Sequence, residues 1–121
     1  MGVRRFQDLR VWKTGHEAVL EAYRLIDVLP IGERFALATQ MRKAAVSITG
    51  NIAEGFGRKQ QRDKSKFYNY SQASLDELRS HIRIAKDRKY ITDTTRLDQL
   101  LDLTAGGLKN LIRANDRGLH P

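Results

Sequence analysis

The chain of 121 residues contains no cysteine and only two prolines, Pro30 and Pro121. The lack of cysteine excludes disulfide bonds, thiolate metal sites and a cysteine nucleophile. The scarcity of proline permits long helices, because proline removes a backbone donor and interrupts helical hydrogen bonding. Apolar runs are short as well, and none approaches the ~18 residues of a membrane span.

The length and the first residues of the chain indicate a simple organisation. A chain of 121 residues is typical of one domain, so we expect a single domain over residues 1–121. Arg4 and Arg5 lie near the start, but no apolar segment of a secretory signal follows them. We therefore expect a soluble, cytoplasmic protein without a membrane partner.

Basic residues are in clear excess over acidic ones. Lys and Arg number 22 and Asp and Glu 14, which corresponds to a formal net charge of +8. Residues 31–91 carry 13 basic and 6 acidic side chains, so +7 of this charge lies in the middle of the chain. Such an excess favours a polyanionic partner, and we expect that partner to meet the middle of the chain.

Four segments place apolar side chains at the spacing of an amphipathic helix. They run roughly over residues 7–29, 33–54 and 63–89, and a fourth starts near residues 93–95. No segment alternates with the period of a strand. The side chains expected in the core are Leu9, Trp12, His16, Val19, Tyr23 and Ile26 in the first segment, Leu37, Met41, Ala44, Ala45, Ile48 and Ile52 in the second, Phe67, Ser71, Ser74, Leu75, Leu78, Ile82 and Ala85 in the third, and Leu97, Leu100, Leu101, Thr104, Leu108, Leu111 and Ile112 in the fourth.

This pattern predicts an all-α fold, an antiparallel up-down-up-down four-helix bundle. Gly55 and Gly57 are expected to end the second helix as a cap and a turn. Residues 58–62 are interpreted as a polar linker, and a bend is expected near Gly50. Among the other aromatic residues, Phe56, Tyr68 and Tyr70 either stack on exposed bases or pack in the protein, and we favour packing.

One stretch of the second segment resembles a known family signature. Residues 40–48 read Gln-Met-Arg-Lys-Ala-Ala-Val-Ser-Ile, and residues 51–58 read Asn-Ile-Ala-Glu-Gly-Phe-Gly-Arg. They resemble the signature of a bacterial four-helix-bundle family that includes proteins encoded in intervening sequences of large-subunit ribosomal RNA genes. Residues 6–12, 29–30, 33–37, 74–78 and 90–91 resemble further segments of this family. The chain departs from the family pattern at Thr49, Ser71 and Ala73.

The resemblance implies an all-helical bundle that assembles as a ring-shaped homopentamer, in a family without an established enzymatic activity. The accessory variability protein of diversity-generating retroelements is a relative, and it binds nucleic acid and a reverse transcriptase. Four residues of the resembling stretch are interpreted as a structural motif, namely Asn51, Glu54, Gly55 and Arg58. In this motif we expect Glu54 to pair with Arg58 or with Arg42, and Asn51 to hydrogen-bond a helix end.

Basic residues in the middle of the chain are the candidate contacts to nucleic-acid phosphates. They are Arg42, Lys43, Arg58, Lys59, Arg62, Arg79, Arg83 and Lys86. The alternative is a solvated helix surface on which these residues pair with Asp76, Glu77 and Asp87.

No pattern indicates catalysis or a cofactor. His16, His81 and His120 lie far apart, and no two of them have the spacing of a helical metal site. We therefore expect no metal, no cofactor and no catalytic residue. Two hypotheses remain: a non-enzymatic oligomer that binds RNA or DNA mainly through phosphate contacts, and an oligomeric scaffold that binds a protein partner without binding nucleic acid.

Overall fold

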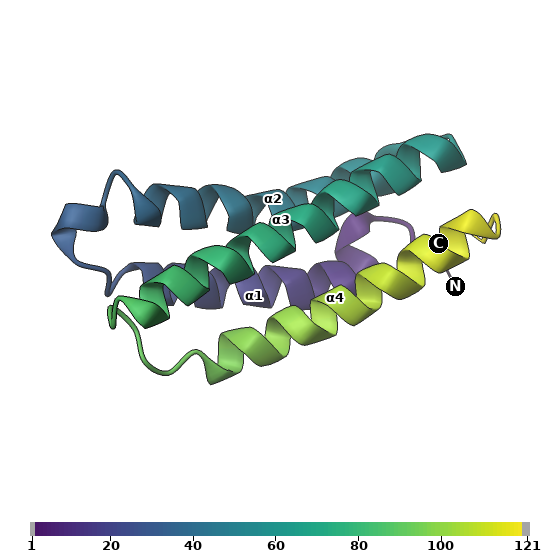
Figure 1. The fold of residues 1–121 in the computed structure, drawn as a ribbon. Helices are drawn as coiled ribbons and strands as arrows, with labels where there is room; N and C mark the ends of the chain where they lie inside the picture. Colours follow the sequence, from purple (N-terminus) through teal and green to yellow (C-terminus); the bar gives the residue numbers. More distant parts are fainter. Residues whose placement is uncertain (1, 120–121) are drawn as a thin grey trace.

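The structure, a computed structural model, describes residues 2–119. The long helices are α1 (Arg10–Ile26), α2 (Leu37–Gly57), α3 (Gln61–Asp87) and α4 (Thr95–Asp116), with short 3-10 helices η1 (Phe6–Asp8) and η2 (Ile31–Glu33). Residues 2–119 contain no strand. Figure 1 shows the four helices side by side, with the α1–α2 and α3–α4 connections at one end and the α2–α3 connection at the other. The prediction of an all-α fold with four helices is confirmed.

Each helix packs against two neighbours, and α2 and α3 form the most extensive pair. Both α1 and α3 contact α2 and α4, so the helices follow one another around the core. The core contains most of the predicted side chains: Leu9, Met41, Ile48, Leu78, Ile82, Leu101 and Leu108 are buried. The predicted faces of α2 and α4 are buried as well, except that Ile112 is half-buried.

The buried face of α1 differs from the predicted one. Trp12 and Tyr23 are only half-buried, and His16 is exposed with its ring stacked on Trp12 at a centroid distance of 4.8 Å. Val19 and Ile26 are buried as predicted, and the other buried residues of α1 are Val11, Gly15, Ala18, Glu21, Ala22 and Leu25. The prediction placed the large side chains of this segment in the core. In the structure, Gly15, Ala18 and Ala22 face the core, and their small size lets α1 lie close to its neighbours.

Two glycines make this close approach possible. A Cβ built at Gly15 would lie 3.2 Å from Cγ2 of Thr49 in α2 and 3.5 Å from Cγ2 of Thr104 in α4. A Cβ built at Gly107 would lie only 2.8 Å from Cγ2 of Val11. Gly107 therefore does not interrupt α4 but provides the notch that Val11 fills.

The end of α2 also differs from the prediction. Gly55 is not a cap, because α2 continues through it to Gly57, and the helix is likewise continuous at Gly50. Gly55 faces Tyr68 of α3, and a Cβ at this position would lie 2.6 Å from Cε1 of the Tyr68 ring. Tyr68 is fully buried, while Phe67, the aromatic residue predicted for the core, is only partly buried.

A methyl group at Gly55 is expected to destabilise the protein, and one at Gly50 to stabilise it. The Cβ of Gly55→Ala would overlap the buried ring of Tyr68, so the free energy of unfolding should fall by about 1–3 kcal/mol. Gly50 is also helical but has no atom within 4 Å of its built Cβ, so Gly50→Ala should raise the free energy of unfolding by about 0.5–1 kcal/mol. Urea denaturation followed by circular dichroism measures both, and equal effects of the two variants would contradict the Gly55–Tyr68 contact.

Candidate nucleic-acid interface

The fold divides the eight candidate phosphate contacts into two groups. Arg58, Lys59 and Arg62 lie at the α2–α3 corner, which we define as residues 54–70. Because α2 and α3 are antiparallel, residues 42, 43, 83 and 86 lie toward the opposite end of the bundle, and residue 79 lies between. The helical rise places Arg42 about 24 Å from Arg58 along α2. The eight residues therefore do not form one continuous patch on the chain.

Ion pairs engage three of these eight residues. Arg58 pairs with Glu54 at 2.7 Å, as predicted, and Arg83 pairs with Asp87 at 3.2 Å. Arg79 reaches across to α4 and pairs with Asp102 at 2.9 Å, a partner that the sequence did not indicate. Within residues 2–119, Lys59 and Arg62 are exposed and make no ion pair, so both remain available for an external anion.

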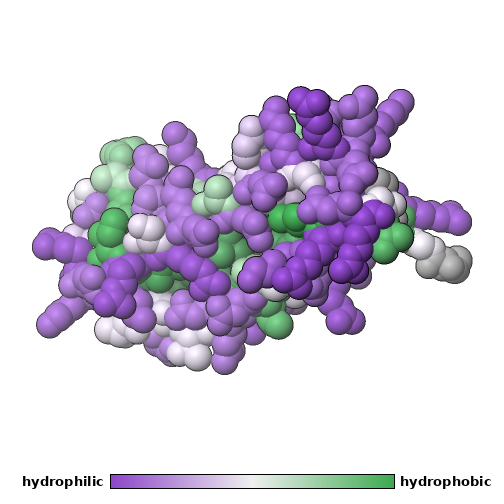
Figure 2. Space-filling view, turned by 45° about the vertical axis from the view of Figure 1, so that its right-hand side comes forward, coloured by the Kyte–Doolittle hydropathy of each residue, from purple (hydrophilic) through white to green (hydrophobic). Residues whose placement is uncertain are grey.

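The net charge is concentrated in the half of the bundle that contains the corner. This half, which we call the basic half, comprises residues 2–18, 47–74 and 106–119 and carries twelve Lys and Arg against five Asp and Glu, a net charge of +7. The other half carries ten against nine, a net charge of +1. In Figure 2 the corner stands out at the upper right as a projection covered mostly by hydrophilic side chains. The basic half is therefore the stronger attractor for a polyanion.

Counting charge along the chain did not reveal this distribution. The chain-based count assigned +7 to residues 31–91, but folding brings the basic residues near both ends of the sequence to the end of the bundle that holds the corner. Phe6 of η1, for example, lines a hollow of the surface together with Glu54 and Arg58. Placing the charges on an antiparallel four-helix topology would have found the basic half from the sequence.

The structural motif links α2 to α3. The Nδ2 of Asn51 donates hydrogen bonds to the backbone oxygen and to Oγ of Ser47, both at 2.8 Å, and this Oγ lies 2.7 Å from Oγ of Ser74 in α3. The expectation that Asn51 bonds a helix end is therefore wrong. Its amide bonds one turn back along α2 and continues a polar network into α3.

A buried lysine of α3 donates hydrogen bonds to carbonyl groups in the last turn of α2. The Nζ of Lys64 donates to the backbone oxygens of Phe56, at 2.8 Å, and of Gly55, at 3.3 Å. The last four carbonyls of an α-helix have no i+4 partner in the helix, and of these two, within residues 2–119, only the Gly55 oxygen also accepts a backbone bond, from the Arg58 N–H at 3.2 Å. Burial lowers the pKa of the Lys64 ammonium below its usual range. The sequence contains no signal for this role of Lys64, because a lysine that follows a polar linker is usually exposed to solvent.

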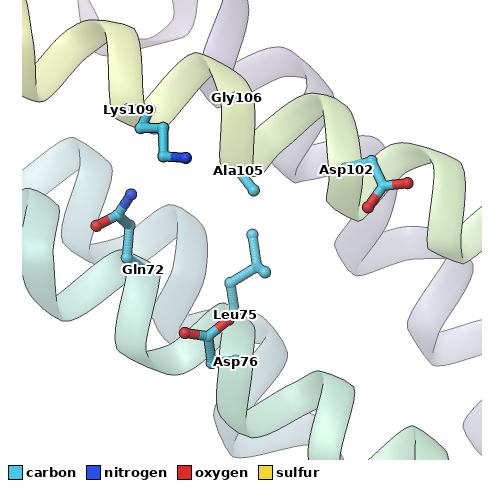
Figure 3. Close-up of a pocket in the computed structure, with 7 residues that line it drawn as sticks. All are labelled: Gln72, Leu75, Asp76, Asp102, Ala105, Gly106 and Lys109. Carbon is cyan, nitrogen blue, oxygen red and sulfur yellow. The ribbon is translucent and has the colours of Figure 1, made fainter.

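A groove between α3 and α4 has mixed charge. It has a volume of ≈ 510 Å³, and its lining comprises Gln72, Leu75, Asp76, Asp102, Ala105, Gly106 and Lys109. Figure 3 shows Gln72 and Lys109 approaching each other near one end, while Asp102 points away from the centre. Asp102 is held by Arg79, and the remaining charges are one carboxylate and one ammonium. This groove offers no excess of positive charge and does not resemble a phosphate site.

The histidines remain apart in the structure. His16 stacks on Trp12, and Nε2 of His81 lies 3.4 Å from a carboxylate oxygen of Glu77, whereas His120 lies outside the described residues. In the described part of the chain, no three His, Asp or Glu side chains gather where they could hold a metal ion. None of the helices described here has both the length and the apolar character needed to cross a membrane.

Comparison with protein families gives a match over most of the chain. Residues 7–112 match the model of the 23S rRNA-intervening sequence protein family. The chain belongs to this family. The match confirms the resemblance found in the second segment and extends it through most of α4. No curated protein matches the sequence.

The structure shows what Ser71 does at the contact between α2 and α3. Ser71 is fully buried, and its Oγ donates to the backbone oxygen of Ile48 at 2.6 Å. This hydrogen bond lies between α2 and α3, where the two helices pack together. The side chain of Ser71 is small enough for close packing, and its hydroxyl is satisfied by the neighbouring backbone.

Removing the hydroxyl of Tyr68 is expected to stabilise the protein. This hydroxyl is buried and has no hydrogen-bond partner among residues 2–119, so at neutral pH Tyr68→Phe should raise the free energy of unfolding by about 1–3 kcal/mol. Burial also raises the pKa of Tyr68 to about 12. Between pH ~10 and ~12 the unfolded chain ionises this group and the folded chain does not, so the stability of the wild type should fall with rising pH.

Denaturant titrations over this pH range, performed on the wild type and on Tyr68→Phe, test both expectations. The variant should lose less stability than the wild type as the pH rises, while the other tyrosines and lysines contribute equally to both proteins. A variant that is less stable than the wild type at neutral pH would show that the hydroxyl has a stabilising partner.

Proposed function

We propose that this protein is a non-enzymatic, oligomeric protein that binds RNA or DNA mainly through its phosphates. The observation that carries the proposal is the net charge of +7 in the basic half of each subunit. A surface of this kind attracts a polyanion and contacts phosphates without reading the base sequence. The description of the family refers to 23S rRNA, which supports an association with RNA.

In this proposal, one group of candidate residues makes the principal phosphate contacts and the other makes secondary ones. Arg58, Lys59 and Arg62 belong to the basic half, and we propose them as the principal phosphate contacts. The five other candidates are Arg42, Lys43, Arg79, Arg83 and Lys86, which lie outside the basic half and are proposed as a secondary contact zone. In an oligomer each zone is repeated in every subunit, so weak individual contacts add up through a high effective concentration.

Self-association is supported by an apolar hollow between α1 and α4. It has a volume of ≈ 370 Å³, and Leu9, Val11, Leu103 and Leu111 are among the residues that line it. Leu103 is 62% exposed. Exposed apolar surface of this kind is typical of interaction sites, and we propose it as a contact between subunits of a ring-shaped homo-oligomer. The resemblance found in the sequence indicates five copies.

Binding should depend on the corner more than on the secondary zone. Each phosphate contact contributes about −0.9 to the slope of log affinity against log salt for duplex DNA and about −0.7 for single strands. The double variant Lys59→Ala/Arg62→Ala should therefore bind more weakly, with a slope shallower by about 1.4 for single strands. Fluorescence anisotropy with labelled RNA at several salt concentrations measures both quantities.

A matched control removes the same charge from the secondary zone. Lys43→Ala/Lys86→Ala deletes two lysines outside the basic half and should change the affinity and the slope less than the corner variant does. Equal effects of the two double variants would refute the special role of the basic half. Absence of binding even at low salt would refute the function itself and favour the alternative, an oligomeric scaffold with a protein partner.

The oligomer is tested independently of nucleic acid. Light scattering at micromolar concentration should give a mass five times the chain mass of 13.9 kDa. Leu103→Glu places a charge in the hollow between α1 and α4 and should lower this mass, without unfolding the chain because the side chain is exposed. A mass of 13.9 kDa for the wild type would contradict self-association, and an unchanged mass for the variant would place the contact elsewhere.

A further inference from the structure

At the α2–α3 corner, the rings of Phe67 and Tyr70 lie next to basic side chains. The rings of Phe67 and Tyr70 pack edge to face, with centroids 5.7 Å apart and planes at 86°. The Arg58 guanidinium lies over the Phe67 ring, 4.5 Å from its centroid, and the Nζ of Lys66 lies 5.9 Å from each ring centroid. Tyr70 is 48% exposed, a high value for an aromatic side chain on a helix.

We infer that this site binds unpaired nucleotides of single-stranded RNA or DNA, and we call it the aromatic–basic cluster. It consists of Arg58, Lys59, Arg62, Lys66, Phe67 and Tyr70. The base of one nucleotide stacks on the Tyr70 ring, and that of another stacks on the exposed side of the Arg58 guanidinium. Lys59, Arg62 and Lys66 contact the phosphates that join them, and Arg58 adds its positive charge to this phosphate contact while its plane faces the base. The inference rests on the proposed function and specifies the form of nucleic acid that the corner recognises.

The contacts of the Arg58 guanidinium hold its plane in a position where a base can stack on it. Its ion pair with Glu54 at 2.7 Å holds the guanidinium in place, and the Phe67 ring supports it from one side. The Arg58 side chain remains 44% exposed, so part of this group is open to a ligand. Planar guanidinium groups and aromatic rings both stack on unpaired bases. In a duplex the bases are stacked on one another, and only the phosphates would be available to this site.

Charge alone accounts only partly for binding at this site. Residues 54–70 contain five basic and two acidic side chains, a net charge of +3, and one of the five, Lys64, is buried with backbone oxygens as partners. Stacking supplies affinity that is independent of charge and of base identity, because every base has an aromatic face. The site is therefore suited to single strands of varied sequence.

Tyr70 is the residue to test, because it is exposed and its hydroxyl makes no hydrogen bond within residues 2–119. Labelled oligo(U) and oligo(dT) of about 15 nucleotides and a duplex of about 15 base pairs serve as probes in anisotropy titrations with the full chain. The wild type should bind both single strands more tightly than the duplex at the same salt concentration. Tyr70→Ala should weaken single-strand binding by about 5- to 150-fold, the loss of one stacked base, and leave the salt slope unchanged.

Three control variants separate stacking from other causes. Tyr70→Phe keeps the aromatic ring and should bind as the wild type does, whereas Tyr70→Leu keeps an apolar side chain without the ring and should resemble Tyr70→Ala. Phe35→Ala removes the other highly exposed ring, 88% exposed and located on the connection between α1 and α2, and should leave binding unchanged. Circular dichroism melting and light scattering verify the fold and the mass of each variant.

The possible results distinguish this inference from the function on which it rests. If single strands and duplex bind equally well and Tyr70→Ala has no effect, the inference is wrong while phosphate binding stands. If no probe binds at low salt, the proposed function is wrong and the inference falls with it. If Tyr70→Ala lowers the mass of the oligomer, Tyr70 belongs to a subunit contact, and this too overturns the inference.

Discussion

The packing of the Tyr68 ring against Gly55 determines how α2 and α3 meet. Because Gly55 has no side chain, the ring occupies the space beside the α2 backbone and becomes fully buried. One turn earlier in α3, Lys64 is drawn to the end of α2, where it donates to the last carbonyls. Both contacts join the last turns of α2 to the first turns of α3, so the corner is a packed element of the fold rather than a flexible linker.

The orientation of the candidate interface follows from this packing. Successive residues of an α-helix point about 100° apart, so the burial of Tyr68 turns Phe67 toward the edge of the helix pair. There Phe67 meets Tyr70 on its own helix and Arg58 from the end of α2. The buried contact between Gly55 and Tyr68 thus places the Phe67 ring and the Arg58 guanidinium at the surface of the corner. Because the burial of Tyr68 orients both groups, the surface of the corner carries aromatic and basic side chains together.

The sequence predicted some helices in detail and others only approximately. The buried faces of α2 and α4 were predicted almost completely, because large apolar residues recur on them at helical spacing. They are Leu37, Met41, Ile48 and Ile52 in α2 and five leucines in α4. In α1 the same reasoning favoured Trp12 and His16, although the helix buries Gly15, Ala18 and Ala22. Small residues contribute little to an apolar pattern, and their role becomes visible only when a neighbouring helix lies against them. Gly55 was misjudged for the same reason.

By itself, the amino-acid sequence determined the helical class, the number of helices, their antiparallel order, the excess of positive charge and the family, because these follow from composition, local periodicity and a contiguous signature. Only the tertiary structure decided which charges lie together. The basic half is formed by three separate parts of the chain, and the candidate phosphate contacts are divided between two ends because α2 and α3 run in opposite directions. It also decided that Tyr68 is buried while Tyr70 is exposed. Neither ring lay on the predicted core face of the third segment, and the space beside Gly55 on the neighbouring helix decides that Tyr68 is the one buried.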